Sequence, residues 1–299
     1  MTIETNARRI KMKTAIMTDT NSGITVQKGK EDGIFVLPMP VIVDNKDYLE
    51  GIDITHEDLY AAMRDGKDIH SSQPAIGAVS DMWDDILKQG YDEILYIPMS
   101  SGLSSSCEMA MGYAQKYNGK VLVADNHRIS FSLYESVYDA KSYAQKGKKA
   151  SEIKDALEKN AYNASIYITV NSLEYLKKSG RVTSAGAAIA TVINLKPVLT
   201  IQGEKLDAYA KVRGMNTAKK KMLQALEEDL NTRFKDVPKE KLQLATAGTF
   251  EHKEDAEAWL DEVNNAFPGF EPYYLPLSCS IACHVGIDSV GTAIAVKDR

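Results

Sequence analysis

Short apolar runs alternate with helical stretches through the first half of the chain. Residues 14–18 (TAIMT), 93–97 (EILYI) and 120–124 (KVLVA) are continuous apolar runs, a pattern typical of strands buried in a parallel sheet. Around Trp83, and again after Leu133, apolar residues recur at helical spacing. This alternation predicts a βαβαβ series, in which a parallel sheet has helices on its faces.

The second half of the chain shows a different pattern. Residues 164–170 (ASIYITV) predict a strand, residues 172–181 a short helix that ends at Gly180, and residues 197–212 a hairpin that turns at Gly203. A lysine-rich helix, another strand, a further helix and a last strand, GTAIAVK, follow. This order of elements predicts an α+β domain.

The two patterns divide the chain. We predict a loose tail over residues 1–13, an N-terminal α/β domain over residues 14–160 and a C-terminal α+β domain over residues 161–299. A chain of 299 residues is long enough for two well-buried cores. The first residues hold two arginines but no apolar core, so they do not predict a signal peptide. No run reaches the about 18 apolar residues that a membrane span needs.

Composition and charge narrow the function. The chain is 44% hydrophobic and 26% charged, as in an ordinary globular protein, and its net charge of −5 argues against a nucleic-acid partner. Its three cysteines lack the paired spacings of a zinc site, so we expect reduced thiols and a cytoplasmic protein. Cys279 and Cys283, placed in a predicted strand, would lie too far apart to share one ion, so no metal is expected.

A serine-rich stretch, SSGLSSS at residues 100–106, lies between a predicted strand and a predicted helix. Its position between ordered elements argues against a flexible linker. A serine hydrolase elbow requires G-x-S-x-G, and Ser104 lacks the second glycine. We favour a third interpretation, in which hydroxyls and free backbone amides at a helix N-terminus face an anion. Serines that only cap the helix would explain one or two of the five.

Two further loops offer the same chemistry. Residues 18–22 (TDTNS) follow the first predicted strand, and residues 70–74 (HSSQP) open a predicted helix at Pro74. Loops at the carboxyl ends of parallel strands meet in the crevice where such sheets bind ligands. The sequence contains no Walker motif and no G-x-G-x-x-G, so we do not expect a nucleotide. The anion is expected to be a small carboxylate or phosphate head group.

The chain resembles the DegV family of fatty-acid-binding, FakB-type proteins from about Thr14 to Val296. Six segments occur in the family's order: IMTDTNSG, SSQPAIG, SSGLSSS, LEYLKKSGRVTS, INLKPVLTIQGEKLDAYAKVRG and ACHVGIDSVGTAIAV. The resemblance implies that a long-chain fatty acid lies buried between an α/β and an α+β domain. It also implies a carrier without catalysis or cofactor, whose partner kinase phosphorylates the bound fatty acid to an acyl phosphate. We further expect transient contact with a membrane surface.

The resemblance assigns the ligand's carboxylate to two hydroxyls. One precedes S-Q-P and is here Ser71; the other is the serine of the S-S-x-L-S loop and is here Ser104. The sequence departs from the family beside both. Threonine is usual where Ser71 stands, and glycine is usual where Ser105 stands.

Arg181 and His284 are candidates for the ligand head or the kinase contact. Arg181 follows Gly180 and matches the family's G-G-R. A surface salt bridge is the ordinary role of an arginine, and we prefer a phosphate or carboxylate clamp, or a kinase contact. His284 stands in ACHVG, where the resemblance places a histidine near the ligand head. A structural role is the alternative for this histidine.

Two functions from different classes therefore remain. The leading hypothesis is a fatty-acid carrier that presents its ligand to a separate kinase. The alternative is a serine hydrolase or acyltransferase that acts on a lipid through Ser104. That nucleophile would need a histidine and an acid; His284 is the only candidate base, and no acid obviously partners it.

Overall fold

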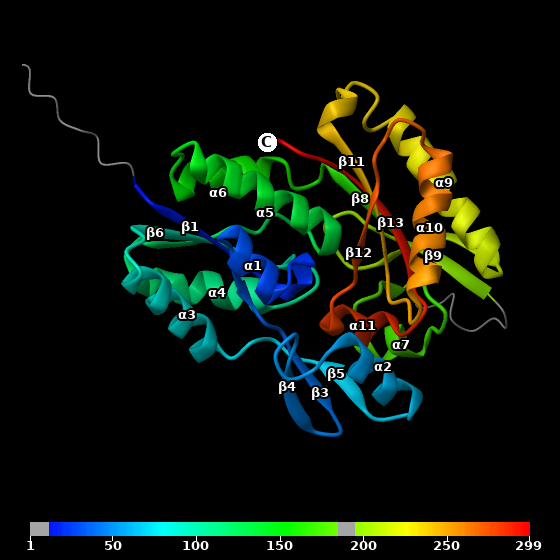
Figure 1. Ribbon diagram of the computed structural model, residues 1–299, viewed down its shortest axis with the longest axis horizontal. Coiled ribbons are helices and arrows are strands. Elements are labelled where there is room, and N and C mark those ends of the chain that lie inside the picture. Colours follow the sequence, from blue (N-terminus) through cyan, green and yellow to red (C-terminus); the bar gives the residue numbers. More distant parts are fainter. Residues whose placement is uncertain (1–11, 185–194) are drawn as a thin grey trace, which may run out of the picture.

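The computed structural model of the chain describes residues 12–184 and 195–299, and three sheets organise these residues (Figure 1). All but the last two residues of the predicted tail, residues 1–13, lie outside the described part. The first sheet is fully parallel, in the order β2-β1-β6-β7, and confirms the architecture predicted for the first half. Its strands are β1 (Thr14–Asp19), β2 (Phe35–Leu37), β6 (Glu93–Ile97) and β7 (Val121–Val123).

Helices cover both faces of the parallel sheet because alternate residues of its strands point to opposite sides. In β1, Ile16 faces one helical layer and Met17 faces the other. The layer over Ile16 contains α1 (Val26–Asp32), α5 (Ser130–Gln145) and α6 (Ala150–Lys159). The layer over Met17 contains α3 (Ile76–Lys88) and α4 (Ser106–Ala114). The carboxyl ends of β1 and β6 are thereby left for loops.

The second sheet has six strands in the order β10-β9-β8-β13-β11-β12 and is antiparallel except between β11 and β12. Its strands are β8 (Ala164–Thr169), β9 (Leu195–Ile201), β10 (Asp207–Arg213), β11 (Leu242–Gly248), β12 (Tyr273–Pro276) and β13 (Val290–Val296). The predicted hairpin is confirmed as the β9–β10 pair.

One face of the second sheet packs on helices, and the other turns toward the first sheet's module (Figure 1). Tyr167 of β8 packs with α9 (Met215–Asn231) and α10 (Lys253–Ala266) on the outer face. Its neighbour Ile168 points to the inner face, where it packs with Leu103 and Ile129 of the first module. The two modules therefore meet across an apolar inner layer.

A small antiparallel sheet in the order β4-β3-β5, which the sequence did not predict, completes the fold. It is built from β3 (Pro40–Val43), β4 (Lys46–Leu49) and β5 (Ile69–Ser71), with α2 (His56–Arg64) beside it. Thr55 caps α2 by accepting a hydrogen bond from the Asp58 amide. This sheet packs with α11 (Cys279–Val285), which comes from the far end of the chain.

The strand predicted over Cys279 and Cys283 is wrong, because these residues begin and continue helix α11. A short apolar run cannot distinguish a strand from one or two turns of buried helix. Ser278 is the signal that favours the helix: its hydroxyl accepts a hydrogen bond from the Ile281 amide at 3.2 Å, as an N-cap does. None of the helices in the described part of the chain has the length and apolar character that a bilayer crossing requires.

Candidate functional site

An apolar cavity lies between the two main sheets. Its walls come from the loops after β1 and β6, the start of α5, the inner face of the second sheet and α11. Aliphatic and aromatic side chains form most of the lining: Met99, Leu103, Ile129, Phe131, Ile166, Ile168, Ile201, Leu206, Ala247, Leu277, Ile281, Val285 and Ala293. An aliphatic lining with a few polar groups is typical of a site for a small apolar ligand.

Asp19 holds together the loop that follows β1 and the loop that follows β6. Its carboxylate accepts hydrogen bonds from the Asn21 amide at 2.9 Å and from the Met99 amide at 3.0 Å. Complete burial raises the pKa of Asp19 to about 6, and the two amide hydrogen bonds act in the opposite direction. Asp19 is therefore a positioning group that holds the first hydroxyl loop against the loop that leads to the serines.

Asn21 connects the first hydroxyl loop to α11. Its side-chain oxygen accepts hydrogen bonds from the hydroxyls of Ser278, at 2.9 Å, and Ser280. Asn21 and Ser280 also line the cavity. Sequence reasoning identified the loop that contains Asn21 but assigned nothing to Asn21 or Ser280, because their partners lie more than 250 positions away.

The second hydroxyl loop, which begins at the end of β5, contacts α11 near the C-terminal end of that helix. The Ser71 Oγ at the end of β5 lies 2.8 Å from His284 Nε2 on α11, within hydrogen-bonding distance. Burial, together with the positive charge of Arg181, lowers the pKa of His284 to about 4. His284 is therefore neutral at pH 7, and its other ring nitrogen, Nδ1, is buried without a hydrogen-bond partner among the described residues.

Arg181 stands beside His284 at the mouth of the cavity. It follows α7 (Glu174–Ser179), which ends as predicted at Gly180 in a left-handed conformation with φ 65°. Its guanidinium donates to the carbonyls of Ser179, at 2.6 Å, and Leu103, at 3.4 Å. Within residues 12–184 and 195–299, no carboxylate forms an ion pair with Arg181. Its charge is therefore uncompensated by an acidic side chain.

Arg181 and His284 line both the apolar cavity and an adjacent polar hollow. The hollow is bordered by the ends of α2 and β5 and by α7, and its lining includes Lys67, Asp68, His70, Ser71, Glu174 and Lys178. Charged and polar side chains thus gather on one side of the pair, and aliphatic side chains gather on the other. The pair marks the boundary between an apolar interior and a polar exterior.

Ser104 is placed differently from the other three candidates. Its amide donates to the Ser100 carbonyl at 3.2 Å, and its Oγ accepts from the Ser106 amide at 3.2 Å. In the described part of the chain it is not among the residues lining the apolar cavity or the hollow. Its neighbour Leu103 contributes to the cavity wall and accepts the hydrogen bond from Arg181. The structure thus brings Ser71, Arg181 and His284 together, and connects Ser104 to them through Leu103.

The hydrogen-bond partners of His284 test the alternative in which Ser104 is a catalytic nucleophile. His284, the candidate base, pairs with Ser71 rather than with Ser104. No described carboxylate accepts a hydrogen bond from either ring nitrogen of His284. A serine and a histidine are therefore adjacent, but the acid that orients the base in a catalytic triad is missing from the described residues.

Only one group of histidine, cysteine and carboxylate side chains in the described residues is close enough to share a metal ion. It consists of Glu50, His56 and Cys279. Cys279 begins α11, whereas His284 lies near the end of that helix. This group is therefore separate from the Ser71–His284 pair.

Comparison with known proteins identifies the family. The family described as "Uncharacterised protein, DegV family" matches residues 13–297. The chain belongs to the DegV family. A DegV domain-containing protein of Deinococcus radiodurans is 28% identical over 285 residues, covering 95% of this chain and 98% of the relative. One from Staphylococcus aureus is 26% identical over 289 residues, with coverage of 95% and 99%.

Solved structures of DegV proteins share the fold. A family member from Thermus thermophilus, described for its fatty acid binding, superposes with a TM-score of 0.84 at 24% identity, covering 95% of this chain and all of that one. A stearic-acid-binding protein from Eubacterium ventriosum gives 0.84 at 20% identity, with coverage of 96% and 98%. The DegV fatty-acid-binding protein of Bacillus subtilis gives 0.82 at 23% identity, with coverage of 96% and 100%.

Proposed function

We propose that this protein binds a long-chain fatty acid in the apolar cavity, with the carboxylate at the Ser71–His284 end. The observation behind this proposal is the abrupt change in lining at Arg181 and His284, from aliphatic side chains to a polar hollow. A ligand that matches it needs a long apolar body and one small anionic end. The fatty acids bound by the Thermus and Eubacterium proteins have this form.

The tail and the head make unequal contributions. Burial of about fourteen CH₂ groups at about 0.8 kcal/mol each supplies roughly 11 kcal/mol before ordering costs. One hydrogen bond to a charged head adds about 1.5–3 kcal/mol. The aliphatic lining therefore sets the affinity, while the polar groups at the mouth set the position of the carboxylate.

The hydrogen-bonding capacity of the mouth suits a carboxylate. If His284 donates from Nε2 to the Ser71 Oγ, the serine proton is free to point at a carboxylate oxygen. Arg181 adds a positive charge that no described carboxylate neutralises. A bound carboxylate would also favour the protonated form of His284 and so raise its pKa from about 4.

We propose further that the protein is a cytoplasmic carrier that presents this carboxylate to a separate fatty-acid kinase, which forms the acyl phosphate. A carboxylate held by hydroxyls at the edge of an open hollow stays within reach of a phosphoryl donor. Arg181 and His284 would help to neutralise the charge that develops during transfer. The family resemblance supports the kinase step, and the position of the mouth supports access to the head group.

Native mass spectrometry of the purified full chain tests the binding proposal. We expect a mass increment that matches one long-chain fatty acid and disappears after lipid extraction. Absence of any lipid, combined with failure to take up added oleate or palmitate, would contradict the proposal. A kinase assay with the loaded protein and a purified fatty-acid kinase tests presentation separately, by detection of acyl phosphate.

The hydrolase alternative receives its own test because the Ser71–His284 contact resembles the start of a catalytic triad. A fluorophosphonate probe should label neither Ser71 nor Ser104, since no acid orients His284. Stoichiometric labelling that is lost in Ser71→Ala or Ser104→Ala would instead support an enzyme.

A further inference from the structure

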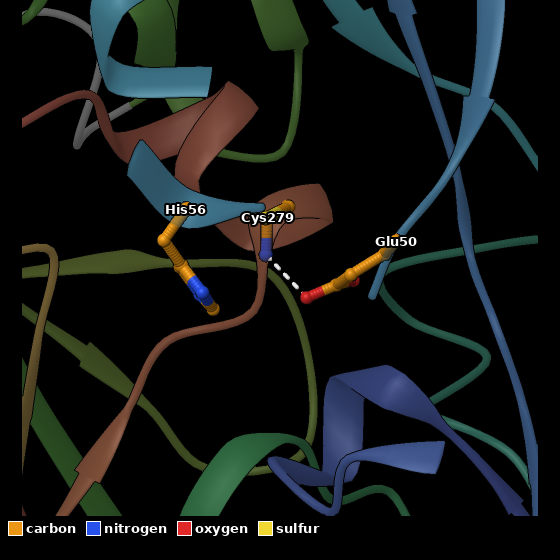
Figure 2. Close-up of side chains that lie close together, drawn as sticks. All are labelled: Glu50, His56 and Cys279. Atoms are coloured by element: carbon orange, nitrogen blue, oxygen red, sulfur yellow. Dashed lines mark hydrogen bonds between the residues drawn. The ribbon is translucent and has the colours of Figure 1, made fainter. Parts of the chain in front are cut away.

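Glu50, His56 and Cys279 converge at the end of α11 that lies away from His284. Glu50 follows β4, His56 is the first residue of α2, and Cys279 is the first residue of α11. One potential ligand atom from each lies within 4.8 Å of the other two. Figure 2 shows the three side chains approaching one another from three separate segments. Residues 50, 56 and 279 are brought together only by packing of the small sheet against α11.

His56 is oriented as a metal-binding histidine usually is. Its Nε2 lies 2.8 Å from the Leu277 carbonyl oxygen, which can only accept a hydrogen bond. Nε2 therefore holds the ring proton, and Nδ1 keeps a free lone pair. Protein ligands to zinc commonly fix their tautomer through such a bond from the other ring nitrogen to a carbonyl.

The carboxyl group of Glu50 is buried, and burial raises its pKa. Only 6% of its surface is exposed, and no lysine or arginine among the described residues forms an ion pair with it. Its oxygens accept hydrogen bonds from the Thr20 hydroxyl at 2.8 Å and the Cys279 amide at 2.6 Å. These bonds orient the carboxylate toward the start of α11.

Capping of α11 alone explains Glu50 but not the other two side chains. The hydrogen bond from the Cys279 amide satisfies a free donor at the start of the helix. Neither this bond nor a hydrogen bond from the Cys279 thiol to Glu50 explains why the His56 imidazole lies beside the same two groups. Nitrogen, sulfur and oxygen donors around a single point are the set that zinc takes in proteins.

We propose that Glu50, His56 and Cys279 form a binding site for a divalent cation of the zinc class. On binding, the Cys279 thiol releases its proton to solvent and the sulfur binds as a thiolate. The thiolate and the carboxylate then balance the two charges of the ion, and His56 binds as neutral imidazole through Nδ1. With three protein ligands, a fourth position stays open for water.

The geometry requires a small movement and allows access. Zinc ligands at about 2.0–2.3 Å from the ion stand roughly 3.3–3.8 Å apart, so the ligand atoms, which lie within 4.8 Å of one another, would approach by at most about 1.5 Å. All three line an open cavity of about 350 Å³ beside the start of α1, through which an ion can enter. The ion would join the small sheet, α2 and α11, and would thereby brace the helix that also holds His284.

Cobalt titration of the full-length protein, freed of metal with a chelator, tests the site. Co²⁺ replaces Zn²⁺ in such sites, and a thiolate ligand gives it a charge-transfer absorption band. We expect one equivalent of Co²⁺ with this band, displaced by one equivalent of Zn²⁺. Cys279→Ser should abolish the band, and His56→Ala should weaken binding at least about tenfold, since even a lost outer partner costs about 10–100-fold.

Cys283→Ser is the matched control. Cys283 lies one turn further along the same helix, is also buried, and donates from its sulfur to the Cys279 carbonyl. Its variant should bind Co²⁺ with the band unchanged. Glu50→Gln, which keeps the shape and removes the charge, guards against loss of binding through misfolding. Circular dichroism should show each variant folded, and a folded Glu50→Gln protein should bind at least about tenfold more weakly.

Several results would overturn the proposal. Wild-type protein that binds no stoichiometric Co²⁺, or binds it without a thiolate band, does not have this site. A band that survives Cys279→Ser, or that is lost in Cys283→Ser, would assign the metal elsewhere. These results are independent of the fatty-acid proposal, because lipid binding is measured separately by mass spectrometry.

Discussion

A histidine lies near each end of α11, and the two histidines have opposite surroundings. At one end His284 faces an aliphatic cavity and the guanidinium of Arg181, with a serine as its hydrogen-bond partner. At the other end His56 meets a buried carboxylate and a thiol, with its proton directed to a carbonyl. The first set of neighbours offers donors and positive charge to an anion, and the second offers lone pairs to a cation. The chemistry of each end is therefore set by what packs around the histidine.

A charged side chain inside the apolar cavity should cause the largest loss of fatty-acid binding. Ile166 lies on the inner face of β8 and lines the cavity. Ile166→Asp should weaken fatty-acid binding more than about 100-fold, because an unpaired carboxylate or its water would compete with the acyl chain. Ile166→Val is the control and should bind nearly as wild type. Displacement of a fluorescent fatty acid measures both, and tight binding by a folded aspartate variant would place the ligand elsewhere.

Acid should destabilise the lipid-free protein through His284. The folded pKa is about 4 and the ordinary value is 6.5, so the unfolded chain takes up the proton first as the pH falls. The stabilising effect of the neutral ring is full above pH 6.5 and is lost between pH 6.5 and 4. We expect a loss of up to about 3 kcal/mol in the free energy of unfolding across this window.

Urea unfolding at several pH values measures this loss. His284→Asn should remove most of the slope between pH 6.5 and 4. The matched control is His252→Asn, which changes an exposed histidine and should leave the slope intact. Equal slopes in wild type and His284→Asn would show that other groups govern the acid response.

Removal of a serine hydroxyl should weaken fatty-acid binding by a smaller factor and leave Co²⁺ binding at the other end of α11 unchanged. Ser71→Ala removes the partner of His284 and should weaken fatty-acid binding about tenfold, the lower limit for a hydrogen bond to a charged head. Ser104→Ala should weaken it less, because Ser104 bonds the Ser106 amide and reaches the site only through Leu103. Neither variant should change Co²⁺ binding, whereas Cys279→Ser should leave fatty-acid binding intact. A larger effect of Ser104→Ala would show that its hydroxyl turns to the ligand.

The smallest effect is expected at Ser105, where the family usually has glycine. Ser105 is the N-cap residue of α4 and has φ −70°, which any residue adopts without strain. Ser105→Gly should therefore change the free energy of unfolding by only a few tenths of a kcal/mol. Thermal melting of the two proteins measures this. A change above about 1 kcal/mol would indicate that the side chain has a role which its backbone conformation does not reveal.

Local patterns predicted much of the fold because they depend on near neighbours. The continuous apolar runs predicted the parallel sheet, and Gly180 predicted the end of α7. The helix over Cys279 was missed because seven residues contain too little periodicity. The small sheet was missed because its three strands are short and two prolines interrupt the run that contains β3.

The sequence by itself determined which residues have suitable chemistry, and the tertiary structure decided which of them meet. Ser71, Arg181 and His284 were named from motifs, but the 2.8 Å contact between Ser71 and His284 depends on packing of β5 against α11. Asn21 with Ser280, and Glu50 with His56 and Cys279, were not predicted. Each of these groupings joins segments more than 200 positions apart. Only burial of a shared core, to which α11 contributes, brings such distant side chains into one site.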